Sequence, residues 1–479
     1  MLRSDKRLMD DNNKKKSKSL IQGAGIYALG TFGTKILSFF IVPLYTYYIA
    51  TSDMGVYDIL MSTVNLLTPI VTLQISDAAY RWVIRDDVVE KEKYIRTTVQ
   101  VLLINCSLAL CIIFLVNEII YSIPYCAYFG VVLLLSRSLQ TFQKLLRALR
   151  KQLLFAISGL CYTIVFLTLN VIQLCIFHMG VECLFQSSII AYALAIILII
   201  ALEPQLRFNI FKKLNISLVK EMYRYSVPLV PNYLNWWVIN SSDRYIVLFA
   251  LGSSFNGLLA IAHKFPSMLQ SVLGLFTNSW QDLSVSDTDK SIGEYYTTVF
   301  RKFYKLALSS MFFIVPVTKV VIYLIMSESY RASCDYVAFY YLGTVFQSFS
   351  SFYGVGYLRS NQTKKAFTTS IYGAIINAFV NIMLINVIGL QAAAISTFVG
   401  FLVMWLVREK QNRNELMIRI NWIEFSVLTG GSILICVLSI STALIQNSIL
   451  SFVGLIVFLT LNYKDLLFII QTTIRRIKK

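Results

Sequence analysis

Stretches of about 20 predominantly apolar residues follow one another along almost the whole chain, and each is long enough to cross a bilayer core of roughly 30 Å as an α-helix. The apolar residues run continuously and do not alternate with a period of two, which indicates helices and not the strands of a membrane barrel. Charged residues make up 14% of the 479 residues, too few to cover a soluble protein of this length. The sequence therefore predicts an all-α polytopic membrane protein.

We expect about fourteen transmembrane helices, in two six-helix bundles around a central cavity with two more helices at the C-terminal end. The predicted spans are 20–49, 55–80, 97–117, 121–144, 153–177, 183–203, 223–251, 257–281, 303–326, 335–358, 366–388, 390–408, 422–444 and 447–469. The predicted parts are a basic cytoplasmic N-terminus (1–19), an N-terminal bundle (20–203), a basic cytoplasmic linker (204–222), a C-terminal bundle (223–408), a cytoplasmic loop (409–421), two extra transmembrane helices (422–469) and a basic cytoplasmic tail (470–479).

The net charge of +18 is distributed very unevenly over these parts. Of the 43 Lys and Arg residues, 37 fall on the side that holds both termini, whereas the opposite loops contain only Arg331. Cytoplasmic loops collect Lys and Arg, so both termini are predicted to be cytoplasmic, in a multi-pass protein of the inner (cytoplasmic) cell membrane. Because one missed span would invert every later loop, the same asymmetry supports the number of spans. The basic charge is thus explained by orientation, and no nucleic-acid partner is expected.

A weak repeat links the two predicted bundles. The segment 41–55, which ends the first span, resembles 243–257, which ends the seventh, at an offset of about 202 residues. Six spans precede the seventh, an even number, so both halves have the same orientation. We therefore expect a parallel repeat, related by an axis along the membrane normal, with a cleft where the two bundles meet.

Five positive residues remain inside the predicted spans: Lys35, Arg137, Arg244, Lys264 and Lys319. A charge at the bilayer centre costs at least about 2.5–3.5 kcal/mol on insertion scales, and such residues usually face a cavity. Arg244, Lys264 and Lys319 each lie about seven or eight residues inside the outer end of their span. At about 1.5 Å of helix rise per residue, this places them roughly 10–12 Å below the outer surface. These residues are our candidates for a cationic cavity that binds an anionic substrate. The alternative for the lysines is that they extend towards the headgroups.

Asp243, Asp58 and Asp77 are acidic residues within predicted spans. Asp243 either binds a coupling cation or pairs with Lys264 or Lys319 on other helices. Asp77 and Arg81 are four residues apart on a helix, which predicts a surface ion pair.

Prolines and glycines interrupt the first and seventh spans, and a proline in a helix removes a backbone hydrogen bond and kinks it. The candidates for kinks or gating are Gly30, Gly33, Pro43, Pro228 and Pro231. Sequence signatures of catalysis are absent: the chain has two histidines, and no nucleophile elbow, Walker loop or HExxH motif. A protein that is not an enzyme, without a metal site or other cofactor, is expected.

The seventh span carries the most distinctive motif. It contains Pro228-Leu-Val-Pro231, Asn235-Trp236-Trp237 and Asn240-Ser-Ser-Asp243-Arg244-Tyr245. This run closely resembles the seventh helix of bacterial polysaccharide flippases, the Wzx-type exporters of lipid-linked oligosaccharides in the polysaccharide transporter family of the MATE-like MOP superfamily. Residues 258–264 with Asn278-Ser-Trp280, and Gly30-Thr-Phe-Gly33 with Pro43-Leu-Tyr45, are similar to the eighth and first helices of that family.

The resemblance implies translocation of an undecaprenyl-diphosphate-linked oligosaccharide from the cytoplasmic to the outer leaflet, for O-antigen, capsule or exopolysaccharide biosynthesis. It implies alternating access between two bundles and an energy supply from a monovalent cation or proton gradient. The five membrane cations would line the cavity and hold the diphosphate. The implied partners are the lipid-linked substrate, membrane lipids, and a polysaccharide polymerase and glycosyltransferases; a monomer is expected.

Two other functions remain open at this point. A MATE-type drug or ion antiporter would share the fold, but cationic drugs prefer carboxylates, and the buried charges here are mostly positive. A membrane polysaccharide polymerase or glycosyltransferase would need an outer loop or domain for its chemistry, and the predicted outer loops are a few residues each.

Overall fold

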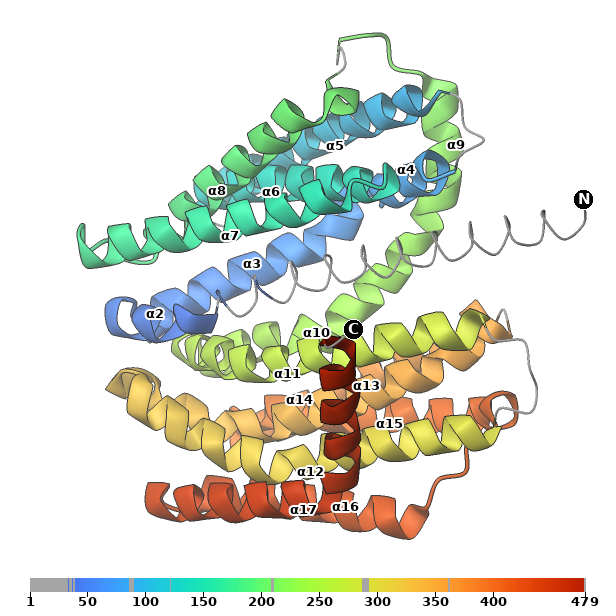
Figure 1. Ribbon diagram of the computed structural model, residues 1–479. Coiled ribbons are helices and arrows are strands. Elements are labelled where there is room, and N and C mark those ends of the chain that lie inside the picture. The colour runs from blue at the N-terminus through green and yellow to red at the C-terminus, as the bar shows by residue number, and fades with distance from the viewer. Residues whose placement is uncertain are drawn as a thin grey trace, which may run out of the picture. The chain divides into compact units, whose positions relative to one another are not determined.

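The computed structural model describes residues 33, 37, 39–85, 90–120, 122–207, 211–286, 293–360 and 362–477. Within these residues the chain forms helices and no strand (Figure 1). Ten of the helices are long and apolar enough to cross a membrane, by length and composition. The predicted all-α polytopic fold is confirmed, and the helices are consistent with the predicted fourteen spans. Two candidate residues, Gly30 and Lys35, and the predicted basic N-terminus (1–19) lie outside the described residues.

The chain divides into two compact units, and two helices contribute to both. The first unit is built around Leu60–Leu234, and the second consists of Pro43–Ile59 together with the chain from Asn235 onwards. Helix α3 (Thr51–Thr72) therefore begins in the second unit and ends in the first, whereas α10 (Val230–Leu251) begins in the first and ends in the second.

The first unit contains the remaining helices of the N-terminal half. These are α4 (Ile75–Val83), α5 (Lys91–Ile119), α6 (Cys126–Ala148), α7 (Gln152–Cys175), α8 (Glu182–Leu202), η1 (Pro204–Leu206), α9 (Ile216–Ser226) and η2 (Val227–Leu229). Residues such as Ala79, Val99, Leu145 and Met222 form an apolar core in which α4, α5, α6, α8 and α9 meet. Burial of these side chains, and not helix propensity, holds such short connected helices together.

Helices α3 and α4 are separated by a break that the sequence did not predict, since one continuous span had been expected over 55–80. Leu73 and Gln74 both have a positive φ, of 46° and 53°, which costs a non-glycine residue stability. Two features favour the break. Pro69 has no N–H for the helix ladder, and the Thr72 hydroxyl accepts from the Gln74 N–H at 3.2 Å in place of a main-chain carbonyl.

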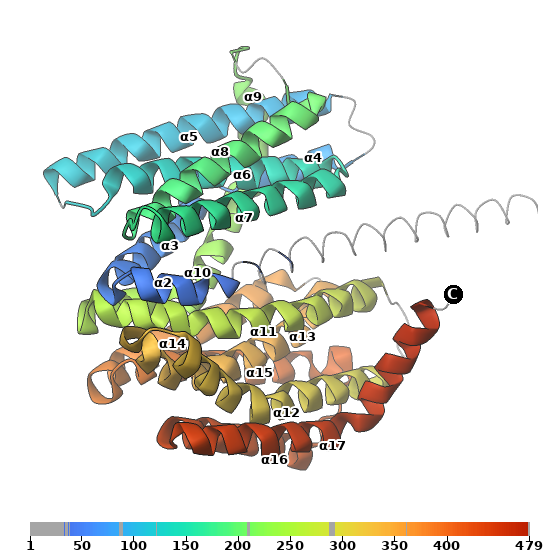
Figure 2. The ribbon, with the colours of Figure 1, turned by 60° about the vertical axis from the view of Figure 1, so that its left-hand side comes forward.

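The second unit contains α2 (Val42–Tyr48), the first half of α3, most of α10, and the C-terminal helices. These are α11 (Ser253–Ser286), α12 (Gly293–Ile325), η3 (Glu328–Tyr336), α13 (Val337–Arg359), α14 (Thr363–Ile388), α15 (Gln391–Leu416), α16 (Trp422–Ser441) and α17 (Leu444–Ile477). Helix α13 is the central one: it packs against α11, α12 and α15, and most of its residues are buried (Figure 2). Stacked rings of Phe352, Trp280, Trp405 and Phe425 strengthen this core.

The two repeat-related segments contact each other directly. Helices α3 and α11 start 202 residues apart, at Thr51 and Ser253. They cross so closely that a Cβ on Gly55 would lie 1.9 Å from the Ser253 carbonyl oxygen, and one on Gly257 would lie 2.0 Å from the Thr51 carbonyl oxygen. The contact is thus reciprocal between the two repeat-related segments. Glycine is needed at both positions because the opposing atoms are backbone.

The three prolines that the sequence offered for kinks or gating lie at two helix starts and at one interruption. Pro43 and Pro231 lie in the first turns of α2 and α10, where the missing N–H has no intrahelical partner to lose. Pro228 lies in η2, a single 3₁₀ turn that interrupts the predicted seventh span between α9 and α10. Gly33 is helical, and a Cβ there would meet nothing within 4 Å. A gating role for these residues stays a prediction.

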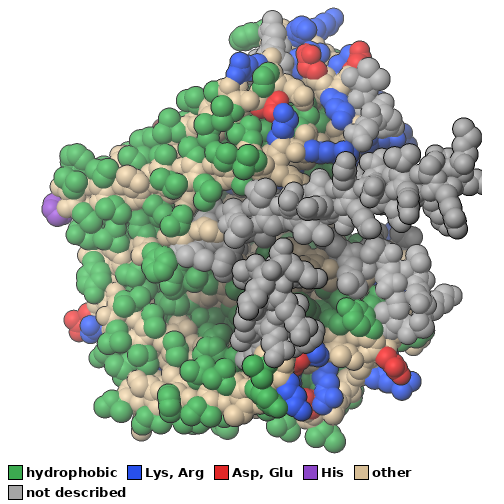
Figure 3. Space-filling view, viewed as in Figure 1, with side chains coloured by type: hydrophobic (Ala, Val, Ile, Leu, Met, Phe, Trp, Pro, Cys, Tyr) green, Lys and Arg blue, Asp and Glu red, His purple; other side chains and the backbone are tan. Residues whose placement is uncertain are grey.

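The surface of the described helices matches a lipid environment. Large apolar side chains are exposed along α5, α14 and α17, among them Leu108, Ile375 and Phe452. Figure 3 shows hydrophobic side chains over the helices, with most of the visible Lys and Arg gathered at the helix ends. A soluble protein does not expose apolar area on this scale.

Candidate functional site

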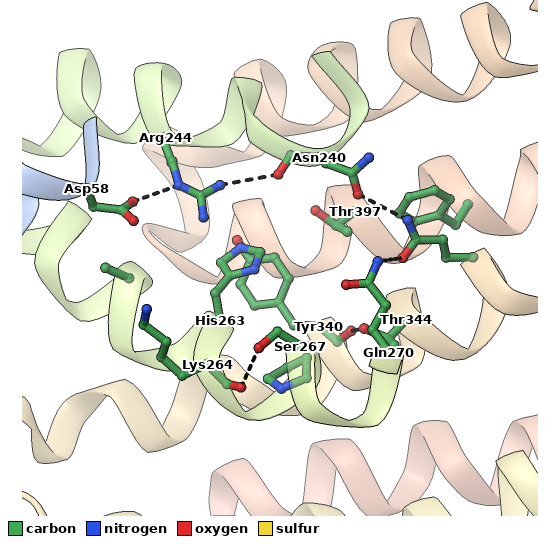
Figure 4. A pocket seen from close by; sticks show the side chains of 14 residues that line it. Asp58, Asn240, Arg244, His263, Lys264, Ser267, Gln270, Tyr340, Thr344 and Thr397 are labelled. Carbon is green, nitrogen blue, oxygen red and sulfur yellow. Dashed lines mark hydrogen bonds and ion pairs between the residues drawn. The ribbon is translucent and has the colours of Figure 1, made fainter. Parts of the chain in front are cut away.

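The second unit contains a polar cavity of about 270 Å³ (Figure 4). Its walls come from α3, α10, α11, α13 and α15. On α10, α13 and α15 the lining residues are three or four positions apart, which places them on one face of each helix. The lining residues are Asp58, Asn240, Arg244, Ala260, His263, Lys264, Pro266, Ser267, Gln270, Tyr340, Thr344, Gln347, Thr397 and Phe401.

Arg244 is held at one end of the cavity by an ion pair that links α10 to α3. Its Nε donates to Asp58 Oδ2 at 2.7 Å, and its Nη1 donates to the Asn240 carbonyl at 3.2 Å. The side chains of Arg244 and Asp58 are 15% and 20% exposed, so both charges are largely removed from solvent but still accessible from the cavity. A charge-assisted hydrogen bond in such surroundings is strong. A ligand in the cavity can still reach the exposed atoms of both side chains and replace one partner.

Lys264 lies on α11, beside His263, and its side chain is exposed in the cavity. Within the described part of the chain, no carboxylate oxygen lies within ion-pair distance of its Nζ. Asp58 and Asp243 both lie within ion-pair distance of Arg244, so Lys264 is the cation at this end of the cavity that has no ion-pair partner among the described residues. Figure 4 shows Lys264, Arg244 and Asp58 towards the same end.

Among the described residues, Asp243 forms no ion pair with either lysine that the sequence had offered as a partner, and its Oδ1 lies 3.7 Å from Arg244 Nη1 instead. It is 3% exposed, and its Oδ2 accepts from the Tyr340 hydroxyl at 2.9 Å and lies 3.4 Å from His263 Nε2. Its Oδ1 accepts from the main-chain N–H of Arg244 at 3.0 Å. The predicted pairing with Lys264 or Lys319 is therefore wrong. Asp243 instead fixes Tyr340 and His263 on the cavity wall.

A row of side-chain amides forms the other end of the cavity. Gln270 Nε2 donates to Gln347 Oε1 at 2.8 Å, and Gln347 Nε2 donates to Asn240 Oδ1 at 3.1 Å. The hydroxyls of Thr344 and Ser267 lie beside them (Figure 4). Amides and hydroxyls that offer both donors and acceptors suit the hydroxyl groups of a neutral, polar ligand.

The structure brings together two of the five predicted cations at this cavity, Arg244 and Lys264. Arg137 lines a separate cavity within the first unit, and Lys35 is outside the described residues. Lys319 does not line either cavity: its Nζ donates to the carbonyls of Ser439 at 2.7 Å and Ile440 at 3.0 Å and pairs with Asp335 at 2.9 Å. It thus satisfies the C-terminal carbonyls of α16, where a cation is favourable.

Lys319→Met should therefore affect stability and not transport. Losing the Lys319 contacts with α16 should lower the free energy of unfolding by about 1–3 kcal/mol. Thermal unfolding of the purified protein measures this loss, and export normalised to the amount of folded protein should stay at the wild-type level. Reduced export per folded molecule would return Lys319 to the transport pathway.

Sequence reasoning missed the carboxylate that holds Arg244. Asp58 and Arg244 are 186 positions apart in the sequence. One partial signal was available: both residues lie in the outer part of their predicted spans, 55–80 and 223–251, and a buried cation calls for a counter-ion nearby. The amides Gln270 and Gln347 carried no such signal, because amides are common at helix contacts in membranes.

A helical membrane fold with charged residues in a polar cavity is typical of membrane transporters. Residues 20–280 match the family described as "Polysaccharide biosynthesis protein", and the chain belongs to that family. The family to which the sequence motifs pointed is thereby confirmed. No curated protein matches the chain significantly.

Solved structures confirm the fold. "Lipid II flippase MurJ, inward closed conformation" superposes with a TM-score of 0.73 at 14% identity, covering 92% of this chain and 99% of that one. "Inward-facing conformation of a multidrug resistance MATE family transporter of the MOP superfamily" gives a TM-score of 0.63 at 12% identity, covering 84% and 96%. The outward-facing form of a MATE family transporter gives 0.57 at 12% identity, covering 86% and 96%. At these identities the likeness concerns the fold.

Proposed function

We propose that this protein is a flippase that moves an undecaprenyl-diphosphate-linked oligosaccharide from the cytoplasmic to the outer leaflet, for the biosynthesis of a surface polysaccharide such as an O-antigen, a capsule or an exopolysaccharide. It does so by alternating access and catalyses no covalent chemistry. Membership of the polysaccharide biosynthesis protein family supports the pathway, and a lipid II flippase of the same fold supports the type of cargo.

The observation that carries this proposal is the uneven lining of the cavity in the second unit. One end holds Arg244 and Lys264, and the other end holds the amides of Asn240, Gln347 and Gln270. A lipid-linked oligosaccharide has the same two parts, an anionic diphosphate and a neutral or weakly charged sugar. Cations bind the diphosphate by charge-assisted hydrogen bonds, and the amides bind sugar hydroxyls. The polyprenyl chain stays in lipid.

Asp58 competes with the substrate for Arg244 in this mechanism. In the absence of an anion the Arg244 guanidinium bonds Asp58 at 2.7 Å. A diphosphate that carries two or more negative charges displaces this carboxylate, with Lys264 as its first contact. Release of Asp58 frees α3 from α10, the two helices that contribute to both units, and so links binding to the conformational change.

Lys264→Gln tests the site without removing a structural contact, because the Lys264 ammonium has no ion-pair partner in the described chain. The loss of one charge-assisted contact to phosphate should weaken substrate binding by about 10- to 100-fold. We expect surface polysaccharide to fall accordingly in cells that carry this variant as their only copy, at normal protein levels. The opposite effect is expected for Asp58→Asn. Because this change removes the carboxylate that competes for Arg244, the diphosphate should bind more tightly. Wild-type export by Lys264→Gln would contradict the site.

The remaining parts of the proposal concern location, energy and partners. We place the protein in the inner (cytoplasmic) membrane with both termini cytoplasmic, and the charge asymmetry supports this orientation. A proton or monovalent cation gradient drives the cycle, and polymerase and glycosyltransferases act on the same lipid-linked substrate. A MATE-type antiporter is less well supported. The carboxylates of Asp58 and Asp243, which a cationic drug would need, are already bound to Arg244, Tyr340 and His263.

A further inference from the structure

The first unit contains a second polar cavity, of about 380 Å³, which the proposed function does not use. It opens beside the break between α3 and α4 and is bordered by one face of α6. Its positive side chains are Arg137, Lys144 and Arg147, and none of the described residues that line it is an Asp or Glu. Polar neutral residues such as Thr68 and Gln140 complete the wall.

Arg137 is the unusual residue in this cavity. Its side chain is buried, with 5% of the residue exposed. Its partners are all neutral: Nη1 donates to Thr68 Oγ1 at 2.5 Å and to Gln140 Oε1 at 3.0 Å, and Nε donates to Ser136 Oγ at 3.1 Å. In the described part of the chain its Nη2 has no hydrogen-bond partner, and no carboxylate forms an ion pair with the guanidinium. A buried cation without a counter-ion is costly unless a ligand supplies the charge.

Arg408 shows what a purely structural buried arginine looks like in the same protein. It is 4% exposed and lines neither cavity. All three of its guanidinium nitrogens are bonded, to Thr369, Ser370 and the carbonyls of Ser350 and Ala366, and so it cross-links α13, α14 and α15. Arg137 lacks this complete shell and borders a cavity instead.

The surroundings of Arg137 favour a negative ligand. Lys144 is already paired with Asp77 at 2.5 Å, and Tyr233 donates to the same carboxylate at 3.2 Å. The predicted pair of Asp77 with Arg81 is thereby replaced, and Arg81 stacks on Tyr225 instead. The first turn of α4 lines the cavity through Gln74 and Ser76, which adds the partial positive charge of a helix N-terminus. Among the described residues that line the cavity, Arg137 is a buried cation that forms no ion pair.

We propose that this cavity is a second anion site, which binds a phosphate or diphosphate group through Arg137. Helix α6 runs from this site into Arg147 and the basic loop that is predicted to be cytoplasmic, so the ligand reaches it from the cytoplasm. Resting on the proposed function, we assign it as the loading site, where the diphosphate is held before it reaches Arg244 and Lys264. The shared chemistry is the phosphate group, whether free or attached to a lipid.

Calorimetric titration of the purified full-length protein with inorganic pyrophosphate tests the site. The titration uses the background D58N/R244Q/K264Q, which removes the charges of the other cavity. One equivalent of pyrophosphate should still bind. Adding Arg137→Gln should weaken this binding by about tenfold or more, and Arg137→Lys should retain most of it. Arg301→Gln is the matched control, because Arg301 is exposed and bonded to Glu424, and it should change nothing.

A second arm replaces pyrophosphate by undecaprenyl diphosphate in lipid nanodiscs. Binding of both ligands, lost in Arg137→Gln, supports the site for the shared phosphate group, and binding of the lipid alone restricts it to the substrate. No binding of either ligand in the triple-variant background, or equal binding with and without Arg137, overturns the proposal. If Arg137→Gln does not fold, the comparison is made with Thr68→Val, which removes the hydroxyl that orients the guanidinium and should weaken pyrophosphate binding. Because this assay measures no transport, failure of the flippase proposal in cells would leave its result intact.

Discussion

Arg244→Gln should abolish export of the surface polysaccharide. The substitution removes the cation that we propose binds the diphosphate, and it leaves Asp58 without the partner that lies 2.7 Å from its carboxylate in the native protein. Breaking a largely buried pair by removing one member costs about 3–5 kcal/mol, so the variant should also be less stable. Surface polysaccharide is quantified in cells that carry the variant as their only copy, together with thermal unfolding of the purified protein.

The double variant R244Q/D58N separates the two effects. The double variant has no carboxylate at position 58, and Asp243, whose Oδ1 lies 3.7 Å from Arg244 Nη1 in the native protein, keeps its contacts with Tyr340 and His263. Most of the thermal stability should therefore return. Export should not return, because the diphosphate still lacks its arginine. If export recovered together with stability, Arg244 would be a structural residue and the proposed binding site would be wrong.

Gly257→Ala should destabilise the second unit more than any other single methyl group added to α11. A Cβ at this position would lie 2.0 Å from the carbonyl oxygen of Thr51 and 2.8 Å from its carbonyl carbon. Both are backbone atoms, so no side-chain rotation relieves the overlap, and α3 must move away from α11. We expect a loss of about 3 kcal/mol or more. Gly55→Ala should behave in the same way, since its Cβ would lie 1.9 Å from the Ser253 carbonyl oxygen.

The control for this prediction lies in the same helix. A Cβ on Gly274 would meet nothing within 4 Å, so Gly274→Ala should leave stability unchanged or raise it by up to about 1 kcal/mol, because alanine favours helix. Thermal unfolding and the yield of monodisperse protein in detergent measure both variants. Equal stability of Gly257→Ala and Gly274→Ala would show that the two helices do not cross at this contact.

Local properties of the sequence determined the class of this protein. The length and hydropathy of the spans predict membrane helices, since the cost of exposing backbone groups to lipid acts on every segment by itself. The repeat at an offset of about 202 residues also predicts that Gly55 and Gly257 occupy equivalent positions. The motif of residues 228–245 indicates the polysaccharide flippases. The cost of a charge in hydrocarbon singles out five cations, of which Arg137, Arg244 and Lys264 line a cavity.

Only the tertiary structure decided how these charges are used. The pairing of Arg244 with Asp58, 186 positions away, depends on the crossing of α3 with α10. Lys319 has the same depth and charge as Lys264, yet the end of α16 supplies it with carbonyls and Asp335, whereas the turn beside Lys264 faces a cavity. The cost of burying a charge is a property of the residue, but the counter-ion that relieves it comes from whichever helix packs alongside, and no local pattern specifies that helix.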